Sequence, residues 1–430
     1  MKVCVFGLWH LGTVTAACVA SGGHEVVGLD FDAEVISKLQ QGIPPLFEPD
    51  LEALVQAGLA SGKLRFTTDP AGALAGADVL WVAYDTPVDD EDNAQVDFVT
   101  GRVESVFPHL AANTLVLISS QLPVGTTRQL EARYREQQYP DTHVSFGYSP
   151  ENLRLGGAIR VFTAPDRVVV GLREAADKEK VQTLLQPFTE NIVWMSVESA
   201  EMTKHALNAF LATSVTFANE IAVLCEYTGA DAKEVERGLK SEARIGPKAY
   251  LAPGAAFAGG TLARDIRFLN ILGEQFQQQT PLLSGVRASN DRHKSWVQRK
   301  LLELLPDLRG KTVAIWGLTY KPGTDTLRRS SAIELCYWAA EQGATVKTHD
   351  PAVRALPDDL HAELCASALD AVRGANVLII STAWADYRDI SAEEVQAAVP
   401  GLTVIDQSRF LEKTLGVDAR LRYVTIGKPL

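Results

Sequence analysis

The sequence predicts an α/β chain in which two doubly wound parallel sheets are joined by a long helical segment. Strand-like apolar runs alternate with helical stretches from the first residues onward. A helical pattern without strands then occupies the middle of the chain, and the opening pattern returns near residue 311. At 430 residues the chain is long enough for two or three domains of ordinary size.

The first predicted domain, residues 1–197, opens with a βαβ unit. Lys2–Leu8 reads as a buried strand, Leu11–Ser21 as a helix and Glu25–Asp30 as a second buried strand. Turn-rich or helical stretches separate the further apolar runs, which are Val79–Ala83, Thr114–Ile118, Val144–Tyr148, Arg167–Gly171 and Ile192–Met195. This succession is typical of a parallel sheet covered by helices on both faces.

The middle of the chain, residues 198–301, is predicted to be helical. One long helical pattern runs from Glu198 to Ala230, and a second stretch runs from about Asp265 to Leu301. These segments are too long and too apolar for a linker. Their extra apolar face suits a subunit interface and, equally well, burial against the flanking domains.

The last predicted domain, residues 302–430, repeats the opening. Lys311–Gly317 resembles Met1–Gly7, a helix follows at about Ser331–Gln342, and Thr345–Asp350 again ends a strand in an acid. Val377–Ser381 and Leu402–Ile405 continue the series of strands. We therefore expect two related Rossmann-like domains, with a looser α/β tail as the alternative for the second.

Composition indicates a soluble, cytoplasmic globular protein. The formal net charge of −12 argues against a nucleic-acid or anionic-membrane surface, so that any phosphate site has to be local. Five scattered cysteines without a CxxC pair fit a reducing compartment and predict no metal site. His361 and Cys365 have helical spacing, which we interpret as a plain helix face. No signal sequence and no membrane span are expected.

The first βα turn carries most of a dinucleotide fingerprint. Gly7 and Gly12 are its first and last glycines, and Asp30 follows at the end of the second strand. An acid there favours the ribose 2′-OH of NAD over the 2′-phosphate of NADP. Trp9 replaces the middle glycine, where the backbone approaches the pyrophosphate, so either its side chain turns away or the cofactor sits differently. A domain that has lost its cofactor is the alternative.

Two further places present polar side chains at suggestive spacings. Lys204 and Asn208 are four residues apart on one face of the long helix, where an amine can accept a proton and an amide can hold a substrate oxygen. Phe257–Asp265 contains a Gly-Gly turn followed by Thr261, Arg264 and Asp265 at the start of a helix. Taken alone, each pattern is also common in ordinary solvated helices and helix starts.

Taken together, the motifs resemble the UDP-glucose/GDP-mannose dehydrogenase family over nearly the whole length. The matching segments are Gly7–Gly12, Gly42–Leu51, Thr86–Pro87, Ser119–Thr126, Ser149–Gly156, Glu201–Ala222, Arg244–Gly246, Phe257–Asp265, Lys321–Asp325, Arg328 and Asp350–Pro351. The resemblance implies an NAD-binding first domain, a central helix that makes a homodimer, and a last domain that helps to hold a UDP-sugar. Most members oxidise a primary alcohol twice, to the carboxylate, with two NAD.

Position by position, the resemblance also implies roles for individual residues. The catalytic set is Lys204, Asn208, Asp265, Glu151 and Thr261; the cofactor set is Gly7, Trp9, His10, Leu11, Gly12, Asp30, Thr86 and Pro87; the substrate set is Leu153, Arg154, Arg244, Phe257, Gly259, Gly260, Lys321 and Arg328. Arg244 is expected to reach the partner's site. Arg409 lies one position from a family arginine.

The chain departs from the family at the residues of the second oxidation. Thr261 stands in place of the nucleophilic cysteine, and a hydroxyl is a far weaker nucleophile than a thiolate. Leu155 replaces a glutamate that could help to hydrolyse a thioester, while Gln121 and Arg264 replace a threonine and a lysine. This pattern predicts a single two-electron step from alcohol to carbonyl, unless water replaces the thiol by forming an aldehyde hydrate.

Two alternatives to that function stay open from the sequence. The altered lining of the site suits a different sugar or a smaller anionic alcohol of specialised metabolism. Trp9 and Thr261 together also allow a catalytically inactive binding or regulatory homologue. Neither alternative involves a metal, a nucleic acid or a membrane.

Overall fold

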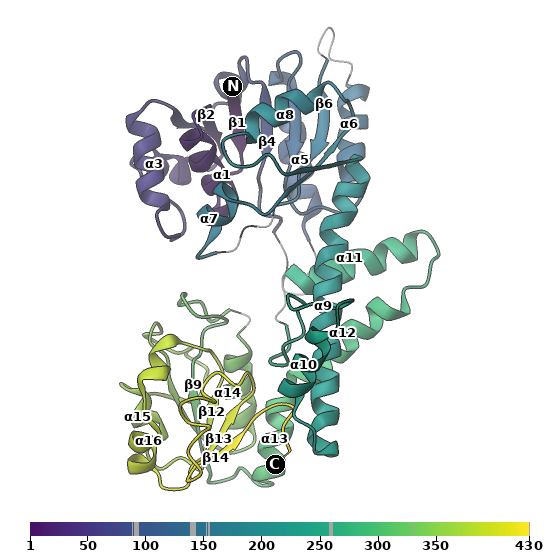
Figure 1. Cartoon of the computed structure of the whole chain (residues 1–430). Coiled ribbons are helices and arrows are strands. Elements are labelled where there is room, and N and C mark those ends of the chain that lie inside the picture. Colours follow the sequence, from purple (N-terminus) through teal and green to yellow (C-terminus); the bar gives the residue numbers. More distant parts are fainter. Residues whose placement is uncertain are drawn as a thin grey trace. The chain divides into compact units, whose positions relative to one another are not determined.

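The computed structural model describes residues 1–87, 89, 94–137, 143–151, 153, 155–257, 261–328 and 330–429. The chain forms two compact units, Met1–Leu207 and Asn208–Leu430. Each unit contains one parallel-rich sheet with helices beside it (Figure 1). The predicted α/β architecture with two Rossmann-like sheets and a long central helix is confirmed.

The sheet of the first unit has the order β3-β2-β1-β4-β5-β6-β7-β8. Its strands are β1 (Lys2–Phe6), β2 (Glu25–Leu29), β3 (Leu64–Thr67), β4 (Val79–Val82), β5 (Leu115–Ile118), β6 (Ser145–Tyr148), β7 (Val168–Leu172) and β8 (Ile192–Met195). Pairing is parallel except between β6 and β7, where the expectation of a wholly parallel sheet is wrong. β3 was not anticipated, because it is short and alternates with exposed residues.

Helices cover both faces of this sheet. They are α1 (His10–Ser21), α2 (Ala33–Gln40), α3 (Leu51–Ala60), α4 (Pro70–Leu74), α5 (Val96–Ser105), α6 (Thr126–Glu136), α7 (Ala158–Thr163) and α8 (Asp177–Leu185), with a 3₁₀ turn η1 (Phe107–His109). Val3, Val5 and Trp81 point to the face that α1, α3, α7 and α8 cover. Their strand neighbours Cys4 and Phe6 point to the face beneath α5 and α6. The strands are buried on both faces and therefore read as continuous apolar runs.

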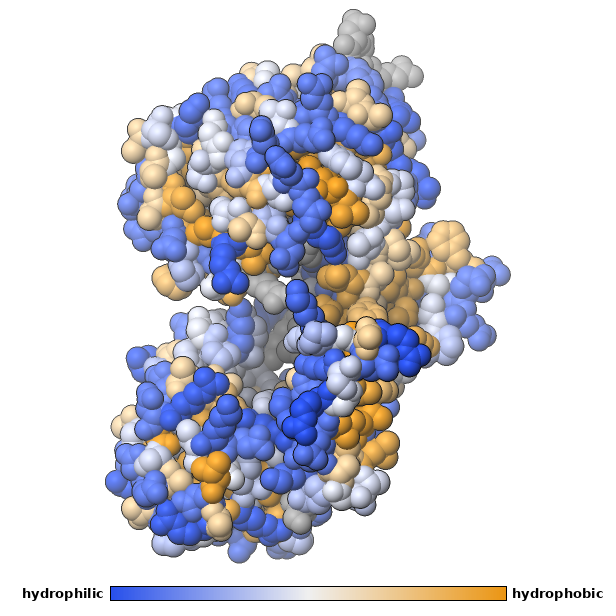
Figure 2. Space-filling view, in the orientation of Figure 1, coloured by the Kyte–Doolittle hydropathy of each residue, from blue (hydrophilic) through white to orange (hydrophobic). Residues whose placement is uncertain are grey.

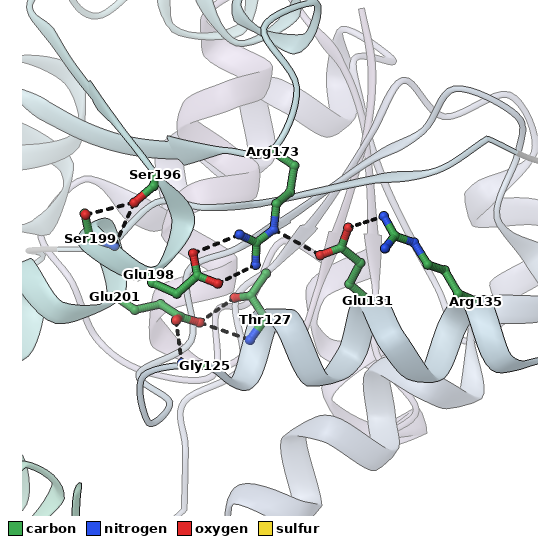
Figure 3. Close-up of polar contacts among 9 residues, drawn as sticks. All are labelled: Gly125, Thr127, Glu131, Arg135, Arg173, Ser196, Glu198, Ser199 and Glu201. Atoms are coloured by element: carbon green, nitrogen blue, oxygen red, sulfur yellow. Dashed lines mark hydrogen bonds and ion pairs between the residues drawn. The ribbon is translucent and has the colours of Figure 1, made fainter. Parts of the chain in front are cut away.

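The long helix α9 (Val197–Thr228) begins in the first unit and is tied to it by charged side chains. Glu201 is fully buried and accepts hydrogen bonds from Gly125 N at 2.6 Å and from Thr127 N and Oγ1 at 3.0 and 2.7 Å (Figure 3). Arg173 makes a bidentate pair with Glu198 and reaches Glu131 on α6 (Figure 3). These contacts fix the rotation of α9 about its own axis one turn before Lys204.

By length and composition, α9 is long and apolar enough to cross a membrane. Among the residues that the structure describes, no other helix meets this criterion. Of the most apolar 18-residue window of α9, 44% is buried. The core helix of a soluble protein meets the same criterion. The predicted segment Glu198–Ala230 matches this helix closely.

In the second unit, helices precede a smaller sheet. After α9 come α10 (Ala232–Ser241), α11 (Thr261–Gln275), α12 (Pro281–Lys294) and α13 (Trp296–Leu304), of which α11 and α12 form a hairpin (Figure 1). The single stretch expected over Asp265–Leu301 is thus divided into separate helices. Gln277, with a positive φ, and Pro281 at the start of α12 explain the turn between the first two.

The second sheet has the order β11-β10-β9-β12-β13-β14 and is parallel throughout its described pairs. Its elements are β9 (Thr312–Trp316), α14 (Ser331–Glu341), β10 (Thr345–His349), β11 (Glu363–Leu364), α15 (Ala368–Val372), β12 (Val377–Ile380), η2 (Ala385–Asp389), α16 (Ala392–Ala398), β13 (Thr403–Asp406) and β14 (Arg422–Val424). His361–Cys365 is not a helix face as expected, because Glu363 and Leu364 pair with β10 as an edge strand. Among the described residues, no cluster of potential metal ligands occurs.

Candidate active site

The turn after β1 has the backbone geometry of a dinucleotide-binding turn. Gly7 has φ +93°, and a side chain there would meet the ring of Tyr84. A Cβ on Gly12 would lie 1.7 Å from the carbonyl oxygen of Gly7, so the helix passes directly over the turn. α1 begins at His10, and its first amide groups are available at the C-terminal edge of the sheet. The two glycines are therefore required by packing.

Trp9 occupies the position of the missing glycine without a positive φ. It precedes the first residue of α1 with φ −78°, a value that any residue adopts, and 48% of it is exposed. Its carbonyl accepts the hydrogen bond from Thr13 N that starts the helix. The turn keeps its backbone shape with a tryptophan at this position, and the expectation that the side chain turns away from the pyrophosphate stays a prediction.

Asp30 follows β2, beside the same turn. Its Oδ2 accepts from Leu8 N at 2.7 Å and its Oδ1 accepts from Asp32 N at 3.0 Å. The carboxylate is partly exposed and keeps further lone pairs for the hydroxyls of a ribose. The turn, the helix start and this acid fit NAD.

Glu48 is a residue of this region whose role the sequence did not reveal. It lies in the predicted Gly42–Leu51 motif, is 4% exposed and contacts His10 Nε2 at 2.9 Å. Its two oxygens also accept from Gly156 N and Ala158 N at 2.8 Å each. Burial opposes ionisation, but these hydrogen bonds outweigh it and hold the pKa of Glu48 below its usual value. Glu48 thus connects the cofactor turn to the segment that follows Glu151.

The other cofactor residues predicted in this unit lie near the ends of its strands. Thr86 is buried and donates from its hydroxyl to the carbonyl of Gln121 at 2.7 Å, which joins two of the family-like motifs. Pro87 is partly exposed, and Leu11 is buried. Leu11 also lines a cavity of about 440 Å³ together with Ser149, Glu151 and Leu153. Leu11 of α1 and the predicted Glu151 segment therefore line one cavity.

Lys204 points at the Glu151 segment from α9. Its ammonium donates to the backbone carbonyl of Glu151 at 2.5 Å and lies 3.9 Å from the carboxylate Oε1. Glu151 Oε2 in turn accepts from Leu153 N at 2.6 Å. Lys204 is 7% exposed. One turn earlier Glu201 holds Gly125, and the next residue, His205, contacts the carbonyl of Leu122 at 2.9 Å. α9 thereby fixes Lys204 against the predicted catalytic segment.

Asn208 and Asp265 meet in the second unit. The Asn208 amide donates to the carboxylate of Asp265, and both side chains are buried. Asp265 is on α11, whose first residue is the exposed Thr261. Phe257 and Leu262, both partly buried, pack against the small apolar cluster of α9, α11 and α12. The predicted loop and the predicted helix pair are thus in contact through this amide and carboxylate.

The remaining predicted substrate residues are more dispersed. Arg154, Gly259 and Gly260 lie outside the described residues. Arg244 is exposed and pairs with Glu242 at 2.9 Å, Lys321 lies over the ring of Tyr320, and Arg328 is exposed. Their predicted contacts with substrate stay predictions.

Arg409 has a structural environment. Its side chain is 6% exposed, pairs with Asp231 at 2.8 Å and donates to the carbonyl of Ile426 at 3.1 Å. Asp231 is the N-cap of α10. These contacts bind the segment after β13 to the helical part of the same unit.

Comparisons with known proteins agree with this architecture. Models of the UDP-glucose/GDP-mannose dehydrogenase family match in three parts: the NAD binding domain over residues 1–189, the central domain over 198–292 and the UDP binding domain over 314–413. The chain is 32% identical to a UDP-glucose 6-dehydrogenase of Pseudomonas aeruginosa, with 100% of this chain and 98% of the relative covered. It is 33% identical to the enzyme of that name from Rhizobium meliloti, with both chains fully covered.

A solved structure shows the same likeness. The UDP-glucose dehydrogenase of the archaeon Pyrobaculum islandicum is 30% identical, and the alignment covers 94% of this chain and 93% of that chain with a TM-score of 0.84. The resemblance seen in the sequence is confirmed, as is the assignment of NAD to the first domain. The chain belongs to the UDP-glucose/GDP-mannose dehydrogenase family and is an NAD-dependent dehydrogenase.

Proposed function

We propose that this protein oxidises an alcohol of a nucleotide sugar by one two-electron step and releases a carbonyl product. The proposal rests on Thr261, which the resemblance assigns to the position of the family's nucleophilic cysteine and which is exposed at the start of α11. The relatives named above are UDP-glucose dehydrogenases, which supports a UDP-sugar as the substrate. The last domain matches a UDP binding domain, which supports the same class.

The chemistry can be assigned to this chain's own residues. NAD, when bound, supplies the acceptor for the hydride that leaves the alcohol carbon. Lys204 accepts the hydroxyl proton or stabilises the developing oxyanion, and Asn208 donates from its amide to the same oxygen. Asp265 holds the Asn208 amide in orientation through their hydrogen bond. Within the first unit, the backbone carbonyl of Glu151 accepts a hydrogen bond from Lys204 and so holds its side chain in place.

The reaction stops at the carbonyl because the residues for acyl chemistry are missing. A thiolate at position 261 would attack the carbonyl carbon and prepare a second hydride loss, whereas the threonine hydroxyl is not ionised near neutral pH. Leu155 offers no acid or base to open a thioester. Both replacements remove functions of the same step.

The test is the ratio of NADH formed to nucleotide sugar consumed, with UDP-glucose first in a panel of sugars and smaller anionic alcohols. We expect one NADH per substrate and a carbonyl that hydroxylamine traps. Thr261→Cys is expected to raise the ratio toward two and to yield some carboxylate, while the matched control Thr261→Ser leaves it at one. Two NADH and a carboxylate from the wild-type protein would refute the single step.

We further propose that the second unit forms a homodimer through an apolar surface on α9. Phe210, Phe217, Leu224 and Tyr227 are exposed on this helix, by 71%, 46%, 59% and 80%. Figure 2 shows hydrophobic patches over the helical part of the second unit, with hydrophilic side chains between them. Exposed apolar patches of this kind mark an interaction site. Phe210→Asp is expected to give a monomer in analytical ultracentrifugation; an unchanged mass at that substitution would contradict this interface. Cytoplasmic residence stays a prediction.

A further inference from the structure

The backbone segment Gly254–Phe257 runs directly ahead of the predicted sugar-binding turn and Thr261. It belongs to no helix or strand, so its backbone amides have no partners in secondary structure. Two buried asparagines provide those partners, one from α9 and one from α12. Neither residue was singled out by the sequence.

Asn290 on α12 makes a two-sided amide pair with Phe257. Its Oδ1 accepts from Phe257 N at 2.9 Å, and its Nδ2 donates to Phe257 O at 3.0 Å. The side chain is 2% exposed. Both backbone polar groups of one residue are therefore satisfied by one side chain, which fixes the orientation of that residue's backbone.

Asn219 on α9 makes a similar pair of hydrogen bonds with the backbone at the other end of the segment. Its Oδ1 accepts from Gly254 N at 2.9 Å, and its Nδ2 donates to Ala255 O at 3.4 Å. It is 1% exposed. His293, one turn after Asn290, adds a contact of 2.9 Å to Gly254 O. Burial lowers the pKa of His293, so it is neutral near pH 7.

These hydrogen bonds are more than helix packing requires. α9, α11 and α12 already pack through Ala209, Ala212, Ile266 and Val286. A buried amide in a helix costs free energy unless each of its groups is paired, and here the partners lie on the loop rather than on another helix. The two asparagine side chains are therefore arranged to hold the backbone of the loop in its conformation.

We infer that Asn219 and Asn290, here called the asparagine pair, are positioning residues for sugar oxidation. They set the course of the chain that leads toward Thr261, and so the placement of the sugar beside Asn208 and Asp265. This inference rests on the proposed function. It assigns no contact with substrate to either asparagine.

The experiment compares Asn219→Ala, Asn290→Ala and Asn290→Asp with the control Asn270→Ala. Asn270 accepts hydrogen bonds from Thr280 and Ser284 at the turn between α11 and α12, away from the loop. Kinetic constants are measured with a nucleotide sugar that the wild-type protein oxidises, UDP-glucose first. The Kd for NAD and the Tm accompany each variant.

Each alanine variant of the asparagine pair is expected to lower kcat/KM for the sugar by about 100-fold, because a misplacement of about 1 Å costs that much. The Kd for NAD stays unchanged, since the cofactor turn lies in the first unit. Asn270→Ala is expected to lower the Tm without lowering kcat/KM. Equal kinetic losses in the control and in the pair would overturn the inference.

Asn290→Asp provides a second test, the pH dependence of kcat/KM, which a merely structural role of Asn290 would not change. The introduced carboxylate can accept from Phe257 N, but it cannot donate to Phe257 O. When protonated it is isosteric with the amide and makes both bonds. Because burial raises the pKa of such a carboxyl, kcat/KM relative to wild type should rise as the pH falls. A ratio independent of pH, at a temperature where the variant stays folded, would contradict the inference.

Amide hydrogen exchange separates this inference from the proposed function. If the wild-type protein oxidises no sugar of the panel, the proposed function fails. The asparagine pair is then judged by the exchange rates of the Gly254 and Phe257 amides. Asn219→Ala should speed the first and Asn290→Ala the second by at least about 10-fold, with α11 unchanged. Unchanged rates would overturn the positioning role.

Discussion

The two Rossmann-like domains begin with the same local structure and use it differently. In the first, Gly7 has φ +93° and Asp30 accepts from Leu8 N at 2.7 Å; in the second, Gly317 has φ +86° and Asp350 accepts from Leu318 N at 2.7 Å. The strand, the turn and the acid therefore correspond. The segments after the two turns differ.

Asp350 has its carboxylate occupied by internal partners. It is 3% exposed, and besides Leu318 N it accepts from Thr319 N, the Trp384 indole and Ala352 N, at 3.2, 3.0 and 2.8 Å. Asp30 is partly exposed and has the two backbone partners described above. In the second domain the next described helix after the turn, α14, begins at Ser331, so its first amides lie well beyond the turn. Asp30 is therefore available for its predicted contact with NAD, whereas Asp350 supports the loop of its own domain.

The largest effect should come from closing the cofactor turn. Gly12→Ala places a Cβ 1.7 Å from the Gly7 carbonyl oxygen, a distance that backbone atoms cannot accommodate. We expect NAD binding to disappear from calorimetric titration. The matched control is Gly101→Ala on α5, where a Cβ meets nothing within 4 Å and helix propensity favours alanine. Normal NAD binding by Gly12→Ala would mean that the turn is not the cofactor site.

Asp30→Asn and Asp350→Asn test the comparison directly. The first should weaken NAD by about 10- to 100-fold, because hydrogen bonds to a charged group contribute about 1.5–3 kcal/mol. The second should leave the Kd for NAD unchanged and lower the Tm, since its hydrogen bonds described above are internal. A change of NAD affinity at Asp350→Asn would show that the two acids are not divided in this way.

A smaller effect is expected from Glu48→Gln, which weakens the link between His10 and the Gly156–Ala158 backbone. We expect a loss of about 1–2 kcal/mol in the free energy of unfolding at pH 7. The pKa of Glu48 is lowered in the folded protein, so its contribution is present above the unfolded value of about 4 and is lost as the pH falls through the folded value. Urea titrations of wild type and variant should therefore converge at acidic pH. A constant difference would argue that the charge of Glu48 is not involved.

The smallest effect is predicted for Trp9→Gly, which restores the missing glycine of the fingerprint. Because Trp9 has ordinary backbone angles and an exposed side chain, the Kd for NAD should change by less than about threefold. Fluorescence titration with NADH measures this change. A gain of about 10-fold or more would mean that the indole obstructs the cofactor after all.

Much of the fold could be predicted because its signals are local. Buried parallel strands are continuous apolar runs, and Gly7, Gly317, Asp30 and Asp350 mark the two βα turns within a few residues. The short strand β3 and the antiparallel pairing of β6 with β7 could not be predicted, because the register and direction of a strand depend on partners far along the chain. The edge strand β11 could not be predicted either, because its two residues are extended only through their pairing with β10.

The candidate site likewise contains residues that the sequence could predict and residues that it could not. Lys204, Asn208 and Asp265 could be named from spacing and family motifs, because their identities carry the chemistry. The supports of the site could not: Glu48, Asn219 and Asn290 resemble ordinary surface residues until their backbone partners are known. Those partners lie from 33 to 110 residues away.

The sequence alone determined the α/β class, the NAD-binding turn and the family, and it predicts that Thr261 replaces a cysteine. Each of these depends on residue identity and on short spacings. Only the tertiary structure decided that the Asp350 carboxylate is occupied by hydrogen bonds within its own domain, while the Asp30 carboxylate is partly exposed. It also decided that buried amides and carboxylates hold the loops of the site. Such assignments depend on which buried donors and acceptors meet, and long-range packing rather than local pattern settles that.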